Sequence, residues 1–242
     1  MLEQQHTVTD RIRKRRICVY CGASGKMTPD HIPPKGIFAR PRPSNLITVP
    51  ACKDCNAGAS EDDEYFKMCL GLNDQARGHP DIKSQTDSIF RALYRPEARG
   101  ISTKLVRETF RVDSISPSGL YLGKRYAFNV DLPRIFRVVE RIVRGLYFHE
   151  TGERLPHSHG VAVWSEETLV ACGHDAIEHA RNTIVAPLLQ VQPKTVGPAT
   201  FSYRHLILPD LASAWLLGFY DRIFFLAVTT RDQDGTATES LS

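Results

Sequence analysis

Two short stretches decide the fold of this chain: Cys18-Val19-Tyr20-Cys21 and Cys52-Lys53-Asp54-Cys55. Each is a CxxC pair, and two such pairs can hold one tetrahedral zinc ion that pins a small, loop-rich segment. Between them lies Asp30-His31-Ile32-Pro33-Pro34, and Asn56 directly follows the last cysteine. The spacing predicts a structural Zn²⁺ on Cys18, Cys21, Cys52 and Cys55, around an insert that carries a carboxylate, an imidazole and amides. Disulfides or an iron–sulfur cluster are the alternatives.

The composition is that of an ordinary globular protein. The chain has 242 residues, of which 42% are hydrophobic and 24% charged, and its formal net charge is +4. Residues 1–50 contain nine Lys or Arg but only three acids, and such a local excess around the cysteine pairs indicates a polyanionic partner. The N-terminus has no apolar signal region, and no uncharged apolar run reaches membrane-spanning length. We therefore expect a cytoplasmic protein that does not enter a membrane.

The hydrophobic pattern predicts an α+β fold with four segments. Residues 1–16 are a basic, flexible lead-in, and residues 17–75 are the zinc module. Residues 85–230 are a larger mixed α+β region for specificity, oligomerisation or regulation, and residues 231–242 are a flexible tail. One helix is expected to begin at residues 60–64, and two others are expected over 131–148 and 174–186. The expected strands cover 45–50, 159–164, 199–208 and 214–229. Residues 101–112 and 120–130 are expected to form a hairpin.

The motifs between and after the cysteines resemble the HNH endonuclease family in its cysteine-bearing form. The resemblance covers residues 17 to about 67, in the order CxxC, Asp30-His31-Ile32-x-Pro34, Asn45-Leu46-Ile47-Thr48-Val49, then CxxC with Asn56. It implies a ββα-metal module that hydrolyses phosphodiester bonds. In that resemblance His31 is the general base that activates water, and Asp30 and Asn56 are the ligands of a catalytic Mg²⁺ or Mn²⁺. Asn45 is the amide that steadies the loop and orients the His31 ring.

Elementary chemistry agrees with these roles. The unperturbed pKa of histidine lies closest to working pH, and carboxylate and amide oxygens suit hard divalent cations. The expected partner is nucleic acid, with double-stranded DNA as the first candidate. The expected contacts are basic residues of the lead-in and the module: Arg11, Arg13, Lys14, Arg15, Arg16 and Lys35.

Some features depart from the family or have simpler explanations. The module lacks the helical histidine that many members use as a metal ligand, so Asn56 must serve in its place, with Asp62 or Asp63 as possible helpers. Each of the proposed site residues also has a purely structural explanation, such as a helix cap for Asn56. Arg134, Arg137, Arg141 and Arg144 share one face of the 131–148 helix, which predicts a solvated surface or, as a minority view, a second DNA contact. His157 and His159 are most simply loop residues.

The competing functions are a catalytically inactive zinc module that binds nucleic acid, and an adaptor that acts through residues 85–230. One active site cuts one strand, so double-strand cleavage would need a homodimer or two successive events.

Overall fold

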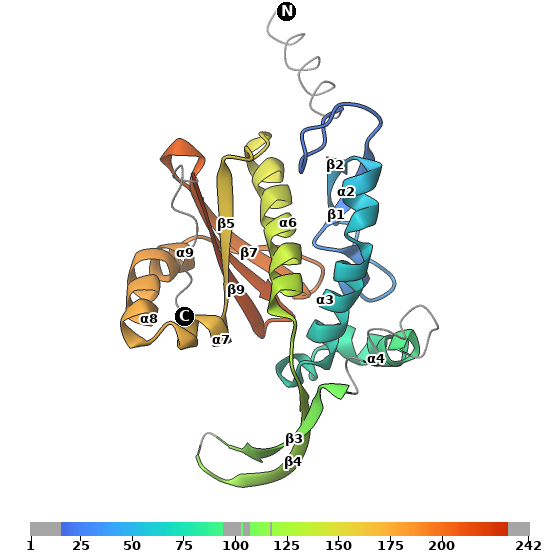
Figure 1. The fold of residues 1–242 in the computed structure, drawn as a ribbon, viewed down its shortest axis with the longest axis vertical. Helices are drawn as coiled ribbons and strands as arrows, with labels where there is room; N and C mark the ends of the chain where they lie inside the picture. The colour runs from blue at the N-terminus through green and yellow to red at the C-terminus, as the bar shows by residue number, and fades with distance from the viewer. Residues whose placement is uncertain (1–15, 94–102, 104–106, 117, 232–242) are drawn as a thin grey trace, which may run out of the picture.

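The computed structural model describes residues 16–93, 103, 107–116 and 118–231. It confirms a mixed α+β fold, with a small N-terminal sheet, a separate hairpin and a larger five-stranded sheet. Figure 1 shows the N-terminal module beside the larger sheet, with the long helix α6 (Leu132–Thr151) between them. Of the basic lead-in, only Arg16 falls within the described residues. Arg11, Arg13, Lys14 and Arg15 lie outside them, as does the tail from residue 232.

The N-terminal module is a two-stranded antiparallel sheet followed by helices. Strand β1 (Thr28–Ile32) pairs with β2 (Ile47–Ala51), so that Asp30 lies opposite Val49 and His31 opposite Thr48. Helices α2 (Lys53–Gly58) and α3 (Ser60–Leu72) come directly after β2. The acidic first turn of α3 complements the positive end of its dipole, which confirms the expected helix start.

The larger sheet is antiparallel, with strand order β5-β9-β8-β7-β6. Its strands are β5 (His159–Ser165), β6 (Lys194–Val196), β7 (Phe201–Ile207), β8 (Ser213–Phe219) and β9 (Ile223–Arg231). The single strand expected over 214–229 is wrong, because the chain reverses between β8 and β9. Tyr220 and Asp221 both have positive φ there, at 53° and 58°. Glycine is the usual residue in that conformation, and neither turn residue is a glycine, so the glycine signal of a tight turn is absent here.

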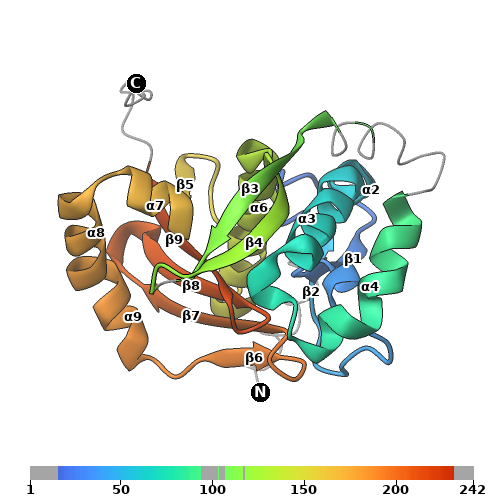
Figure 2. The same cartoon turned by 90° about the horizontal axis from the view of Figure 1, so that it is seen from below.

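Alternate residues of the sheet pack on opposite sides. One face, with Trp215 and Leu217 of β8, packs against α6 in the main core. The other face, with Ala214 and Leu216, packs in a second cluster against the helical segment after β5. That segment comprises α7 (Glu166–Ala171), α8 (His174–Ala180), a π-helical turn (Arg181–Val185) and α9 (Ala186–Gln190). Figure 2 shows these helices along the far side of the sheet from α3.

The module and the larger region share one hydrophobic core. Val19, Ile32 and Phe66 of the module are buried together with Val139 and Trp215 of the larger region. Helix α4 (Pro80–Leu93), which the sequence analysis did not predict, adds hydrogen bonds to both the module and the larger region. Gln85 of α4 donates to the carbonyl of Ile37, and Thr200 donates to Asp81. The module is therefore built into the fold and is not a detachable unit.

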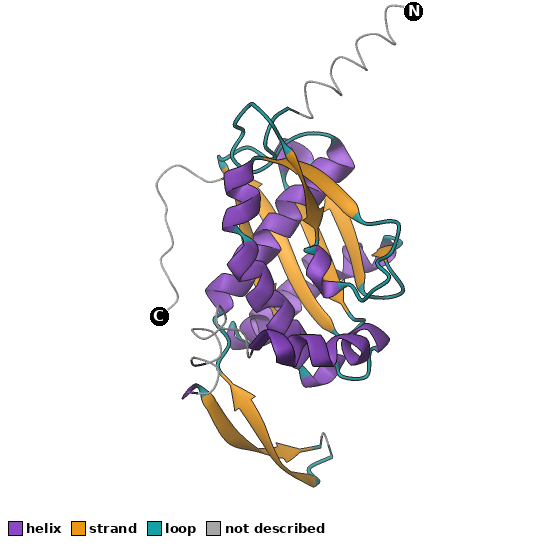
Figure 3. Cartoon of the chain, turned by 90° about the vertical axis from the view of Figure 1, so that its right-hand side faces the viewer, coloured by secondary structure: helices purple, strands orange, loops and turns teal. Residues whose placement is uncertain are grey.

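The hairpin between the two parts projects away from this core. Strands β3 (Thr109–Ile115) and β4 (Tyr121–Phe128) pair antiparallel, which confirms the expected hairpin. The first strand begins later than the expected 101–112 and extends beyond it. Figure 3 shows it extending beyond the body of the molecule.

Candidate functional site

The structure brings the four predicted zinc ligands together. The sulfur atoms of Cys18, Cys21, Cys52 and Cys55 all lie within 4.8 Å of one another, and all four thiols are free. The Cys21 and Cys52 sulfurs are 3.7 Å apart. A tetrahedral zinc ion with bonds of about 2.3 Å separates its sulfur ligands by about 3.8 Å. The four sulfur donors and their spacing therefore fit Zn²⁺. None of the four cysteines forms a disulfide in this structure.

The electrostatics of the cluster also suit a bound cation. Burial opposes ionisation of the Cys18 thiol, but hydrogen bonds from the backbone at Cys21 and Cys52 outweigh it and lower the pKa of Cys18 to about 7. Burial and the neighbouring sulfurs raise the pKa of Cys55 well above its usual value. A bound metal ion would supply the positive charge that lets every thiol ionise.

Asp30 and His31 point to opposite sides of β1, as adjacent strand residues do. Asp30 is buried, and its Oδ2 accepts a 2.6 Å hydrogen bond from the Tyr20 hydroxyl. The same oxygen lies 3.7 Å from Nε of Arg141, a residue of α6. Burial, and next the negative charge of Asp30, raise the pKa of Tyr20, so its hydroxyl stays a donor.

Arg141 lies between two carboxylates. Its Nη2 donates to both oxygens of Asp63 on α3, at 2.7 and 2.8 Å. Burial opposes its charge, but Asp30 and Asp63 more than compensate and raise the pKa of Arg141. Its side chain is 10% exposed, and its buried Nε and Nη1 make no hydrogen bond. Asp30 thus lies beside an internal guanidinium whose positive charge it shares with Asp63.

His31 lies on the other side of the strand with two cations nearby. Partial burial, and next the positive charge of Lys35, lower the pKa of His31 below its usual value. Arg42 acts in the same direction, while Asp30 opposes them. Arg42 is held beside Lys35, because its Nε donates to the Lys35 carbonyl. The imidazole is therefore neutral near pH 7, and both cationic side chains are exposed.

The two predicted amides have different environments. Nδ2 of Asn56, on α2, donates to the Thr28 hydroxyl at 2.9 Å, so Asn56 lies against the Asp30 side of β1. Asn45 makes its hydrogen bonds to other residues. Its Nδ2 donates to the Thr195 carbonyl, and its Oδ1 accepts from the Gly197 amide. Among the described residues its amide makes no hydrogen bond to His31, so it fastens the module loop to β6 and does not orient the ring.

A divalent cation on Asp30 and Asn56 does not fit the arrangement as it stands. The Asp30 carboxylate is buried and already faces a guanidinium and a hydroxyl. Asp62 and Asp63, the possible helpers, are paired with arginines of α6: Arg134 and Arg137 with Asp62, and Arg141 with Asp63. Within the described part of the chain, the cysteine cluster is the one group of three or more His, Cys, Asp or Glu side chains spaced to hold a metal.

These pairs correct the expected role of the α6 arginines. Three of the four pair with carboxylates of α3, and of these Arg134 and Arg141 are mostly buried whereas Arg137 stays 57% exposed. Arg144 bonds Glu140 and the His159 carbonyl. A cavity of about 480 Å³ lies between α6 and the cysteine module. Its charged lining residues are Asp54, Asp62, Glu140, Arg137, Arg141 and Arg144. Because carboxylates and arginines are equal in number, we assign the cavity no charged ligand.

The remaining predicted residues are also placed. Arg16 is exposed just before the first cysteine pair. Nε2 of His157 lies 3.4 Å from the Cys21 carbonyl, whereas Nε2 of the buried His159 lies 2.9 Å from the Asp210 carbonyl. The two histidines therefore do not form a shared metal site. Sequence reasoning missed Tyr20 and Arg141, although a tyrosine inside the CxxC pair was visible in the sequence.

Comparison of the chain with protein-family models, curated proteins and solved structures finds no match. Among the described residues, no helix has the length and apolar character needed to cross a membrane.

Proposed function

We propose that this chain is an HNH-type endonuclease that hydrolyses phosphodiester bonds, with DNA as its first candidate substrate. The observation that carries the proposal is the placement of the half-buried His31 imidazole near Lys35 and Arg42, on a hairpin framed by four clustered cysteines. Burial and the charge of Lys35 lower the pKa of His31, which favours the neutral form. A neutral imidazole can accept a proton, and two exposed cations can hold the phosphate that is attacked.

The chemical step follows from these groups. Water attacks the phosphorus atom and gives its proton to His31, while the bond to the leaving oxygen breaks and that oxygen takes a proton from solvent. Lys35 and Arg42 balance the negative charge that grows on the phosphate oxygens. Partial burial keeps His31 unprotonated before the attack, which is the form that a general base requires.

The family resemblance adds a catalytic Mg²⁺ or Mn²⁺ on Asp30 and Asn56. Because the Asp30 carboxylate is buried, accepts the Tyr20 hydroxyl and lies beside Arg141, we route no step through such an ion. Whether activity needs an added divalent cation is therefore a result of the experiment and not an assumption of the proposal.

The test is cleavage of supercoiled plasmid, single-stranded DNA and RNA by the full chain, with and without added Mg²⁺ or Mn²⁺. We expect His31→Ala to abolish nicking with unchanged zinc content and unfolding curve. His149→Ala is the matched control, since His149 is an exposed histidine near the end of α6. Full activity of His31→Ala would refute the role of the imidazole.

A binding protein without catalysis is the competing function. It would bind DNA in a salt-dependent manner but leave every substrate intact, with or without divalent cations.

A further inference from the structure

Arg141 lies where carboxylates of two different elements converge. Asp30 comes from β1 and Asp63 from α3, and both face the guanidinium that α6 supplies. The side chains of Asp30, Asp63 and Arg141 are 6%, 24% and 10% exposed, so the group is largely withdrawn from water. A carboxylate withdrawn from water needs a positive charge beside it, and a metal ion or a guanidinium can supply that charge.

Asp62, another possible helper of a metal ion, is paired in the same way. Its Oδ1 accepts from Nε of Arg134 at 2.7 Å, and its Oδ2 accepts from Nε of Arg137 at 2.9 Å. Burial opposes ionisation of Asp62, but the two arginines outweigh burial and lower its pKa. The carboxylates that the sequence assigned to a divalent cation, or to its support, therefore all face arginines of α6.

Charge, more than directed hydrogen bonding, places Arg141 beside Asp30. Arg141 donates through Nη2 to Asp63, whereas its buried Nε and Nη1 make no hydrogen bond to any described residue. Nε nevertheless lies 3.7 Å from Oδ2 of Asp30. Burial lowers the pKa of Arg141, and the charge of Asp30 is the largest effect that opposes burial, ahead of that of Asp63. Fastening α6 to α3 requires Asp63 alone, so the contact with Asp30 calls for a separate explanation.

We propose that Arg141 is the resident cation on the Asp30 side of β1, in the place that the family resemblance gives to a divalent ion. Mg²⁺ requires near-octahedral coordination by oxygen atoms and retains several waters, which the buried surroundings of Asp30 do not accommodate. A second cation there would also be repelled by Arg141, because charges in a buried site are weakly screened. The wild-type chain therefore binds no divalent ion at Asp30.

The consequence for catalysis rests on the proposed function. Lys35 and Arg42 lie near His31, on the other side of β1 from Asp30, and they supply the charge that faces the phosphate. Arg141 does not touch that phosphate, so it is a positioning residue that acts on β1 through Asp30. Cleavage by the zinc-loaded chain should therefore need no added divalent cation.

Removing the guanidinium should turn the same carboxylates into a binding site for a divalent ion. The cavity of about 480 Å³ is lined by Arg141 and Tyr20, so a hydrated ion can reach this place from it. In Arg141→Met the carboxylates in the lining of that cavity outnumber its arginines, whereas in the wild type the two are equal. Asp30 and Asp63 then lack a cation, and an ion that keeps part of its water shell can replace it.

The test is Mn²⁺ binding to the full chain, measured by electron paramagnetic resonance after the cysteine site has been filled with zinc. It compares the wild type with Asp30→Asn, Arg141→Met, Arg137→Met and the double variant Arg141→Met/Asp30→Asn. Arg137→Met is the matched control, because it makes the same substitution on the same helix but leaves Arg141 beside both of its carboxylates. Zinc content and circular dichroism verify that each variant is folded.

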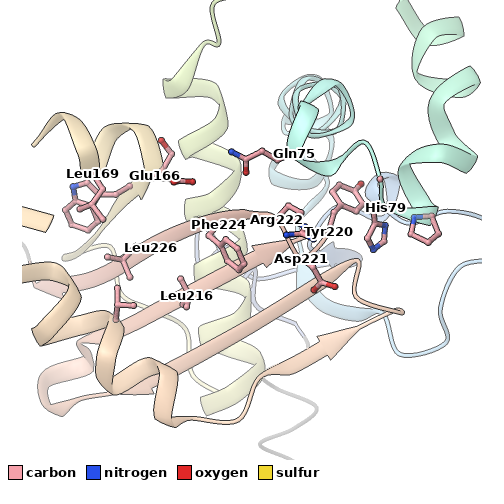
Figure 4. Close-up of a pocket in the computed structure, with 15 residues that line it drawn as sticks. Gln75, His79, Glu166, Leu169, Leu216, Tyr220, Asp221, Arg222, Phe224 and Leu226 are labelled. Atoms are coloured by element: carbon pink, nitrogen blue, oxygen red, sulfur yellow. The ribbon is translucent and has the colours of Figure 1, made fainter. Parts of the chain in front are cut away.

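The variants at Asp30 separate this place from other carboxylates. Figure 4 shows Glu166 and Asp221 at a different cavity, of about 990 Å³, which shares no lining residue with the cavity beside Arg141. Exposed carboxylates of this kind can bind Mn²⁺ weakly. Binding is therefore assigned to the Asp30 side of β1 only where Asp30→Asn removes it.

We expect no stoichiometric Mn²⁺ on the wild type or on Arg137→Met. Arg141→Met should bind one equivalent, with a Kd about 10-fold or more below that of the wild type, and the added Asp30→Asn should remove this gain. Binding of one equivalent by the wild type that Asp30→Asn abolishes would overturn the inference. A folded Arg141→Met that binds Mn²⁺ no better than the wild type would overturn it as well.

A measurement on the wild type alone covers the case in which Arg141→Met does not fold. Mn²⁺ broadens the NMR signals of nuclei close to it, so the amide signals of Asp30 and Asp63 should keep their widths when Mn²⁺ is added. Broadening of both signals by one equivalent of Mn²⁺ would place an ion there and refute the inference.

These measurements do not depend on nuclease activity. A wild type that cleaves no substrate would refute the proposed function, while the Mn²⁺ results would still decide the role of Arg141. Nicking that requires added Mg²⁺, although the signals of Asp30 and Asp63 stay sharp with Mn²⁺, would overturn the part of the inference that concerns cleavage.

Discussion

Replacing Arg141 by Met tests the central electrostatic argument, because it removes the guanidinium while keeping an unbranched apolar side chain. Asp30 is 5% exposed, and the Asp63 side chain is 24% exposed, so both carboxylates would be left without their cation. Breaking a buried ion pair from one side costs about 3–5 kcal/mol. Since Asp63 is partly exposed, we expect the lower end of that range, about 3 kcal/mol of unfolding free energy.

Urea unfolding at two pH values separates this cause from a loss of packing. In Arg141→Met the unpaired carboxylates have raised pKa values, so the penalty is complete at pH 7 and shrinks as the pH falls and they become protonated. Adding Asp63→Asn should recover part of the loss at pH 7. Arg137→Met is the control, since Arg137 is 57% exposed and its pair with Asp62 is worth about 1 kcal/mol or less. A loss no larger than that of Arg137→Met, or one that is the same at both pH values, would refute the reasoning.

Three further predictions test the base, the metal and the packing. Lys35→Gln removes a positive charge near His31 and should raise the pKa of His31. The fall of the nicking rate at acid pH, expected below pH 6.5 in the wild type, should then move to higher pH. Rate profiles against pH and NMR titration of His31 measure this shift. Cys55→Ser should abolish stoichiometric zinc and lower the Tm by about 10 °C, measured by metal analysis and calorimetry. Gly145→Ala should cost about 1–2 kcal/mol in urea unfolding, because the new Cβ would lie 2.6 Å from Ile32 Cγ1, and Ile32→Ala should remove that extra cost in a double-mutant cycle.

Each of these has a matched control. Lys53→Gln removes an exposed lysine of the same module, and it should leave the pH profile unchanged. Cys172→Ser removes an exposed thiol outside the cluster, so zinc and Tm should stay as in the wild type. Gly58→Ala adds a Cβ that meets nothing within 4 Å. An unchanged acid limb in Lys35→Gln, full zinc in Cys55→Ser or additive Gly145 and Ile32 effects would contradict the respective argument.

The sequence predicted those features that depend on local pattern. The apolar spacing of residues 131–148 gave α6, and two CxxC pairs gave the cysteine cluster, because both signals are contained in short stretches. The break at Tyr220 and Asp221 was missed, since the conformation is held by tertiary contacts: the Tyr220 hydroxyl donates to the Ile37 carbonyl in the core. Neither residue is a glycine, so no turn signal was visible.

The candidate site was predicted less completely, for a physical reason. Asp30 was recognised by its neighbour His31, but its partner Arg141 lies more than one hundred positions along the chain. In the sequence pattern of a helix, an arginine that faces solvent cannot be distinguished from one that faces a carboxylate of another helix. Only the docking of α6 on α3 distinguishes them. The approach of α6 to β1, which Gly145 allows, is equally a feature of the tertiary structure.

The two sides of β1 divide the site between a fixed and an accessible half. Asp30 is held by Tyr20 and Arg141, whose positions depend on the first cysteine pair and on α6. His31 takes its orientation from the same strand, so both the cysteine cluster and the larger region determine where the imidazole lies. Loss of the metal or displacement of α6 should therefore reduce catalysis by the same route, a shift of β1, although the two perturbations are far apart in sequence. If zinc removal left the pKa of His31 unchanged while it abolished the Arg141 pair, the two halves would be independent and this coupling would be wrong.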